Sequence, residues 1–232
     1  MDKIKVMSSS DDPETVFATM YKALIDRGFD RMKIFVKESR DLMLVKKDQM
    51  MGNFKYELEN FPDSRELTSR VYSEHFENYD RNFVAILMNS TFTSAYTLFE
   101  VTFDKICSFA QARYGLKLSV SDLAGGDIIG KSKKYIEKVA GVNLDSIDKH
   151  WIELTDYRKI RNCVVHDSAV VGSDNIHLTK FIRNHKHIGV INPLETGTTT
   201  FYIKDIEFVF AFCDLAHDYL SFVLKEVIKA KP

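Results

Sequence analysis

The sequence predicts an all-α helical bundle with a small β-hairpin inserted before the last helix. Residues that interrupt helices are scarce, because the 232 residues include only 4 prolines and 10 glycines. Hydrophobic residues make up 45% of the chain and aromatic residues 12%, which is typical of a packed core and not of a disordered chain. Apolar residues also recur at helical spacing over most of the length.

The first part of the chain predicts three helices. The run Asp11-Asp12-Pro13-Glu14 has the residues of a helix start, and Gly28 predicts the end of that helix. A second, amphipathic helix is expected over residues 32–47 and a third over residues 65–79. The apolar stripe of the second consists of Ile34, Phe35, Leu42 and Val45.

Residues 80–114 hold the longest helical pattern, which is too apolar for a surface helix and predicts the central helix of the core. Its apolar positions are Phe83, Leu87, Phe92, Tyr96, Leu98, Phe99, Phe103, Ile106 and Ala110. Later helices are expected over residues 128–139, 145–166 and 204–229. Residues 188–192 and 199–203 alternate and are β-branched, which predicts a hairpin with its turn at Pro193–Gly197.

We expect residues 1–79 to form an N-terminal helical extension and residues 80–232 a helical domain, packed as one unit. The net charge of −1 and the pI of about 6.7 give no global argument for nucleic acid, so a nucleic-acid site must be a local patch. The sequence has no apolar run long enough for a membrane span and begins with a polar segment. Cys107, Cys163 and Cys213 are expected to be reduced core residues of a cytoplasmic protein.

The motif that points to chemistry is Arg161-Asn-Cys-Val-Val-His166. At about 100° per residue, Asn162 and His166 share a polar helix face with Thr155 and Lys159, and Arg158 lies at its edge. Arg161 lies about 140° from His166, on the apolar side of the helix. Because a guanidinium on a core stripe needs a partner or a wet cleft, we expect it to pair with Glu100.

The same Arg-to-His spacing occurs at Arg70 and His75, where we interpret it as accidental. The asparagine after Arg161 makes the motif more specific, with a chance of random occurrence on the order of one in eighty. The alternative is that Arg161 belongs to an ion pair in the core, and that Asn162 and His166 are two ordinary surface residues.

The stretch Tyr157–Asp167 resembles the signature of the HEPN superfamily, in which Arg, a polar residue, three variable residues and His lie late in a helical bundle. The resemblance covers about residues 80–232, including the helix with Glu100, the Gly130-Lys131 helix entry and the final helix. It implies a homodimeric, metal-independent endoribonuclease. A toxin or phage-defence effector is a role that such an enzyme can have, and an antitoxin or another inhibitor protein is then a candidate partner. Arg161, Asn162 and His166 would be its catalytic residues, with Glu100 and Arg158 supporting them.

The most basic stretch, Lys180–His187, offers Lys180, Arg183 and Lys186 to an RNA backbone, and a solvated hairpin edge explains it equally well. We considered a metal at His177, His185 and His187. No carboxylate or cysteine lies at ligand spacing from them along the sequence, so we expect no metal and no cofactor.

Two functions therefore stay open. The first is RNA cleavage, which requires the face of Asn162 and His166 to open on a cleft that a nucleotide can enter. The second is a non-catalytic, HEPN-like nucleotide-binding or dimerisation module, which tolerates an occluded or monomeric site.

Overall fold

The computed structural model describes residues 13–172, 174–191 and 197–230, which form parts of two compact units. Among the described residues, the first unit comprises 13–29, Thr97–Ile152 and 215–230, and the second comprises those within Asp30–Tyr96 and Glu153–Asp214. The expected division after residue 79 stays a prediction.

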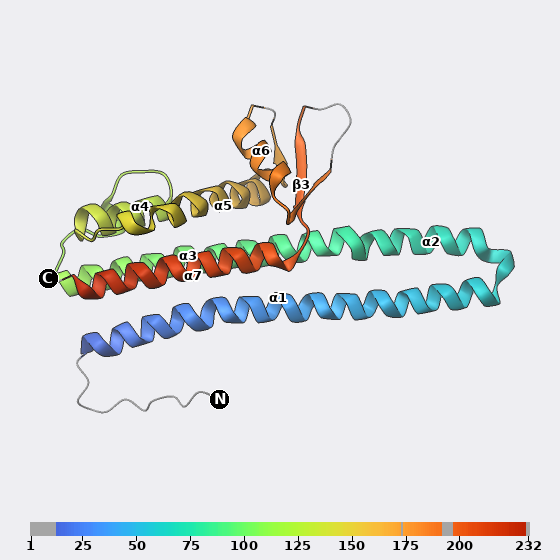
Figure 1. Cartoon of the computed structure of the whole chain (residues 1–232), viewed down its shortest axis with the longest axis horizontal. Helices are drawn as coiled ribbons and strands as arrows, with labels where there is room; N and C mark the ends of the chain where they lie inside the picture. Colours follow the sequence, from blue (N-terminus) through green and yellow to red (C-terminus); the bar gives the residue numbers. More distant parts are fainter. Residues whose placement is uncertain (1–12, 173, 192–196, 231–232) are drawn as a thin grey trace. The chain divides into compact units, whose positions relative to one another are not determined.

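The first half of the chain is made of long helices (Figure 1). In order, its elements are α1 (Pro13–Asn60), η1 (Pro62–Ser64), α2 (Arg65–Glu77), the π-helical η2 (Asn78–Asn82), α3 (Phe83–Tyr114) and η3 (Val120–Asp122). The second half continues with α4 (Ile128–Lys134), η4 (Tyr135–Val139), η5 (Asp145–Ile147), α5 (Asp148–His166), β1 (Val170–Val171), α6 (Ile176–Asn184), β2 (Ile188–Ile191), β3 (Thr199–Ile203) and α7 (Ile206–Lys229).

This arrangement confirms the predicted fold class, a helical protein with a small antiparallel sheet before the last helix. Within the described ranges, every helix is too short or too polar to cross a bilayer.

The first helix differs from the prediction, because α1 runs through Gly28 without a break. Gly28 has no positive φ, and a Cβ at this position would lie 3.1 Å from Leu98 Cδ2. The glycine thus lets α1 approach α3 closely in the first unit and does not end the helix. Asp11 and Asp12 of the expected helix start lie outside the described residues.

The apolar stripe of residues 32–47 is exposed. Ile34, Phe35, Leu42 and Val45 keep between 52% and 68% of their surface accessible. In the second unit, the buried residue of α1 is Val36, which lies on another side of the helix. Periodicity along a helix shows that a face is apolar but not whether another element covers it.

Aromatic rings fill the core of the second unit. Phe92 and Tyr96 of α3, Tyr157 of α5, and Phe208 and Phe212 of α7 form what we call the aromatic cluster, and all are buried. Its ring centroids lie 5.1 Å apart for Phe92 and Phe208 and 5.3 Å apart for Tyr157 and Phe212. Because each pair adds about 0.5–1.5 kcal/mol to the effect of burial, the cluster fixes three helices against one another.

A helical hairpin of α1 and α2 extends the second unit (Figure 1). The Phe54 ring of α1 lies 5.0 Å from Tyr72 and 5.6 Å from Phe76 of α2. The Tyr72 hydroxyl donates to Glu57 Oε1 at 2.9 Å.

The sheet confirms the predicted hairpin and enlarges it. Strand β3 pairs antiparallel with β2 and with the short β1, in the order β1-β3-β2. Gly189 faces Tyr202, and a Cβ on Gly189 would lie 2.4 Å from Tyr202 Cζ, so the glycine makes room for that ring. Helix α6 and strand β1 were not predicted, and residues 192–196 of the expected turn lie outside the described residues.

All three cysteines are free and buried, as predicted for core residues. Burial raises the pKa of the Cys107 thiol, in the first unit, to about 12. Burial likewise raises the pKa of the Cys213 thiol, in the second unit, to about 12. Both thiols are therefore protonated at neutral pH.

A histidine joins α1 to α7 in the first unit. His217 Nε2 lies 3.0 Å from Asp26 Oδ1, and His217 Nδ1 lies 3.1 Å from Asp218 Oδ1. Burial alone would lower the pKa of His217, but the hydrogen bonds to Asp218 and Asp26 outweigh it and raise that pKa. The pKa of Asp26 falls, because hydrogen bonds with Lys22 and His217 outweigh the effect of its burial.

We therefore expect this contact to stabilise the fold in a pH-dependent way. A raised histidine pKa adds stability that is complete below the unfolded-state pKa of about 6.5 and is lost as the pH rises through the folded-state pKa. The lowered Asp26 pKa adds stability that is lost as the pH falls through its folded-state value. His217→Gln should thus lower the free energy of unfolding more at pH 6 than at pH 9.

The effect should stay below about 1 kcal/mol, since the side chains of His217 and Asp26 are 34% and 38% exposed. Urea unfolding at the two pH values measures it. His177→Gln is the control, because His177 is exposed on α6. Equal losses of stability at pH 6 and pH 9 for His217→Gln would contradict the prediction.

Candidate functional site

Helix α5 carries the motif on its last turns. Leu154, Tyr157 and Ile160 are buried and hold this part of α5 in the second unit. The helix ends at His166, as predicted. Packing of the inward face therefore determines which way the motif residues point.

Arg161 is half-buried and contacts both an aromatic ring and an amide. Its guanidinium carbon lies 5.5 Å from the centroid of Tyr96, and Nη1 donates to Asn162 Oδ1 at 3.1 Å. Tyr96 is fully buried and stacks on Phe212 with ring centroids 5.5 Å apart. The aromatic cluster thus provides a rigid surface for Arg161, and a guanidinium favours the face of such a ring.

Asn162 and His166 are exposed, four residues and about one helical turn apart. On the same face, Thr155 is half-buried and Lys159 pairs with Asp156 at 2.7 Å. Asn162 and His166, which the sequence placed on one polar face, are thus accessible to solvent.

The chain turns sharply after His166. The carbonyl of Cys163 accepts hydrogen bonds from the backbone N–H groups of Asp167 at 3.1 Å and Ala169 at 2.9 Å. Ser168 and Ala169 have φ values of 51° and 60°, in the left-handed region that side chains disfavour. The carbonyl of Ala169 then accepts the N–H of Phe201 at 3.0 Å, so the end of α5 is tied directly to β3.

The two supporting residues differ in position. Arg158 is half-buried on α5, on the turn before the motif. Glu100 belongs to the first unit and Arg161 to the second, and their predicted pairing stays a prediction. Sequence reasoning missed the contact of Arg161 with Tyr96, although Tyr96 lies four residues before Glu100, about one helical turn away.

The three basic residues expected to contact RNA are all exposed. Lys180 and Arg183 lie on α6, and Lys186 lies in the link to β2. Arg183 Nη2 donates to Thr199 Oγ1 at 3.4 Å, which connects α6 with β3.

His187 has a carboxylate beside it in space, although none lies at ligand spacing from it along the sequence. Its Nδ1 atom lies 2.7 Å from Asp205 Oδ1, although the two residues are far apart in the sequence. The antiparallel pairing of β2 and β3 causes this proximity, which spacing along the chain could not reveal.

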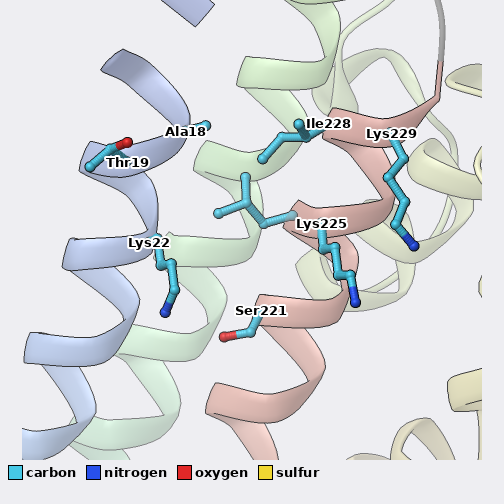
Figure 2. Close-up of a pocket in the computed structure, with 8 residues that line it drawn as sticks. Ala18, Thr19, Lys22, Ser221, Lys225, Ile228 and Lys229 are labelled. Carbon is cyan, nitrogen blue, oxygen red and sulfur yellow. The ribbon is translucent and has the colours of Figure 1, made fainter. Parts of the chain in front are cut away.

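A separate groove lies between α1 and α7 in the first unit (Figure 2). It holds about 430 Å³ and is lined mostly by apolar atoms, with the ammonium groups of Lys22, Lys225 and Lys229 at its rim. Lys22 pairs with Asp26 at 2.9 Å and Lys229 with Glu226 at 2.7 Å, so two of the three charges are neutralised locally. The motif residues belong to the second unit and are not part of this groove.

Comparison of the chain with protein-family models, with curated proteins and with solved structures finds no match. The resemblance to the HEPN superfamily stays a prediction that rests on the motif and its surroundings.

The left-handed turn after the motif has a measurable cost. Ser168→Gly should raise the free energy of unfolding by about 0.5–1 kcal/mol, because glycine adopts φ 51° without strain. Urea unfolding measures the change. Ser64→Gly is the control, since Ser64 is exposed at φ −97° and has no such strain to release. A loss of stability in Ser168→Gly would mean that its side chain contributes more than the strain costs.

Proposed function

We propose that this chain is a metal-independent endoribonuclease that acts through Arg161, Asn162 and His166. The observation that carries the proposal is their arrangement at the end of α5. A guanidinium hydrogen-bonded to an amide lies on a rigid aromatic surface, and an exposed imidazole follows about one turn later. These groups can bind a phosphate, stabilise negative charge and transfer a proton.

The reaction that fits them is transesterification within RNA. The 2′-oxygen attacks the adjacent phosphorus while its proton passes to a base, and the bond from phosphorus to the 5′-oxygen breaks. The 5′-oxygen takes up a proton, which leaves a 2′,3′-cyclic phosphate and a 5′-hydroxyl. His166 transfers one of these protons, Arg161 stabilises the charge on the phosphorane, and Asn162 holds Arg161 or the phosphate.

A second copy of the chain completes the site in this proposal. Arg161 and His166 diverge by about 140° around one helix, so one copy does not present both groups squarely to the same phosphate. Two motifs that meet across a dimer supply an arginine and a histidine to each phosphate, and a second histidine for the other proton. This supports a homodimer with a composite site, as the HEPN resemblance implies.

The exposed Lys180, Arg183 and Lys186 of the same unit suit contacts to the RNA backbone. A chain with a net charge of −1 needs such a local basic patch. An enzyme that cuts cytoplasmic RNA needs restraint, so we include an inhibitor protein among its partners and a toxin or phage-defence effector as its role.

The test is cleavage of total RNA in EDTA. Wild type should produce fragments with 2′,3′-cyclic phosphate and 5′-hydroxyl ends. Arg161→Ala and His166→Ala should each lower the rate by about 10²-fold or more, since each removes a group that acts in the transition state. Arg70→Ala and His75→Ala are matched controls, because these exposed residues have the same spacing on α2 and should leave cleavage unchanged.

Mixing the two inactive variants tests the composite site. Mixed dimers of Arg161→Ala and His166→Ala chains should regain part of the activity if each site takes one group from each copy. Loss of cleavage in EDTA would contradict a metal-independent mechanism. RNA binding without cleavage by a folded dimer would favour the non-catalytic module.

A further inference from the structure

A second group of chemically capable side chains lies at the junction of the sheet and α7. Ile188 pairs with Ile203, so the preceding residue, His187, lies opposite Lys204, and the Lys204 N–H donates to the His187 carbonyl at 3.1 Å. The next residues are Asp205 and then Glu207 in the first turn of α7. The strand register thus brings one imidazole and two carboxylates from separate segments to one place.

The ligand atoms of these three side chains converge. One ring nitrogen of His187, a carboxylate oxygen of Asp205 and one of Glu207 all lie within 4.8 Å of one another. In the part of the chain that the structure describes, no other group of three or more histidines, cysteines and carboxylates does so. All three residues belong to the second unit.

Asp205 adds an independent observation. Its Oδ1 atom is buried and has no hydrogen-bond partner among the described residues, although His187 Nδ1 lies only 2.7 Å away. The contact is close but lacks the geometry of a hydrogen bond. Since a buried carboxylate oxygen without a hydrogen bond is costly, something more than the imidazole is expected to satisfy it.

We propose that His187, Asp205 and Glu207 bind a divalent transition-metal cation, with Zn²⁺ as the best fit. Zinc takes imidazole nitrogen together with carboxylate oxygen, whereas Mg²⁺ and Ca²⁺ prefer oxygen alone. Two carboxylates balance the two charges of the cation. Ligand atoms of one tetrahedral zinc ion lie about 3.3 Å apart, so His187 Nδ1 and Asp205 Oδ1, which are 2.7 Å apart, need to separate by about half an ångström.

The half-buried His187 and Asp205 and the exposed Glu207 leave the site open on one side for water as a fourth ligand. The cation would connect the start of β2 to the start of α7. Its role would be to stabilise the sheet, and it takes no part in the proposed cleavage by Arg161 and His166.

The alternative to a metal site is a simple ion pair between His187 and Asp205. Replacing Glu207 distinguishes the metal site from the ion pair. An ion pair does not need Glu207, whose position in the first turn of α7 already suits the helix dipole. A metal site loses a ligand when Glu207 becomes glutamine. Because Glu207 is exposed, this substitution leaves the fold intact even where replacing His187 disturbs it.

The experiment is calorimetric titration of the metal-stripped full chain with Zn²⁺ and, separately, with Mg²⁺. We expect one Zn²⁺ per chain, bound at least tenfold more tightly than Mg²⁺, and a rise in melting temperature with Zn²⁺. Glu207→Gln and His187→Gln should each weaken Zn²⁺ binding about tenfold or more. His177→Gln should not, since His177 lies outside the group.

Absence of Zn²⁺ binding, or binding that is unchanged in Glu207→Gln, would overturn the proposal and leave an ion pair at this position. Neither result bears on the ribonuclease proposal, because the titration does not measure cleavage. Conversely, a chain that binds Zn²⁺ through these residues but does not cleave RNA would support the zinc site and contradict the ribonuclease proposal.

Discussion

The aromatic cluster is the constraint on which the second unit depends. Its five rings come from α3, α5 and α7. A shift of any one of these helices would therefore disrupt its ring contacts with the other two. Tyr96 takes part twice, with one side stacked on Phe212 and its ring also in contact with the Arg161 guanidinium. The position of the motif arginine is therefore a consequence of core packing.

Local sequence patterns determined much of the fold. Periodicity and scarce helix breakers predicted the helical class, the extent of α2 and α3 within a few residues, and the end of α5 at His166. The alternating residues of β2 and β3 predicted the hairpin. Gly28 shows the limit, because a glycine can end a helix or let two helices approach, and only the side chain opposite, Leu98, decides between these roles. The exposed apolar face of α1 is a second example, because the sequence pattern showed the stripe but not whether another element covers it.

In the candidate site, too, some features could be predicted from the sequence and others could not. Helix angles were enough to place Asn162 and His166 on one accessible face, since both lie on a single helix. The contact of Arg161 with Tyr96 and that of His187 with Asp205 join segments that are distant in the chain. Such contacts depend on how helices pack and how strands pair, so residue spacing does not reveal them. The sequence thus identified side chains with suitable chemistry more readily than it identified their neighbours.

The buried cysteines make it possible to measure the opening of each unit separately. Cys107 lies in the first unit and Cys213 in the second, both fully enclosed and both with a pKa of about 12. A thiol reagent reacts with the thiolate, so it modifies these residues only after the surrounding helices open to water. The rate at which each cysteine is labelled then measures how often its own unit opens. Equal rates would indicate that the two units open together, and unequal rates that one opens before the other.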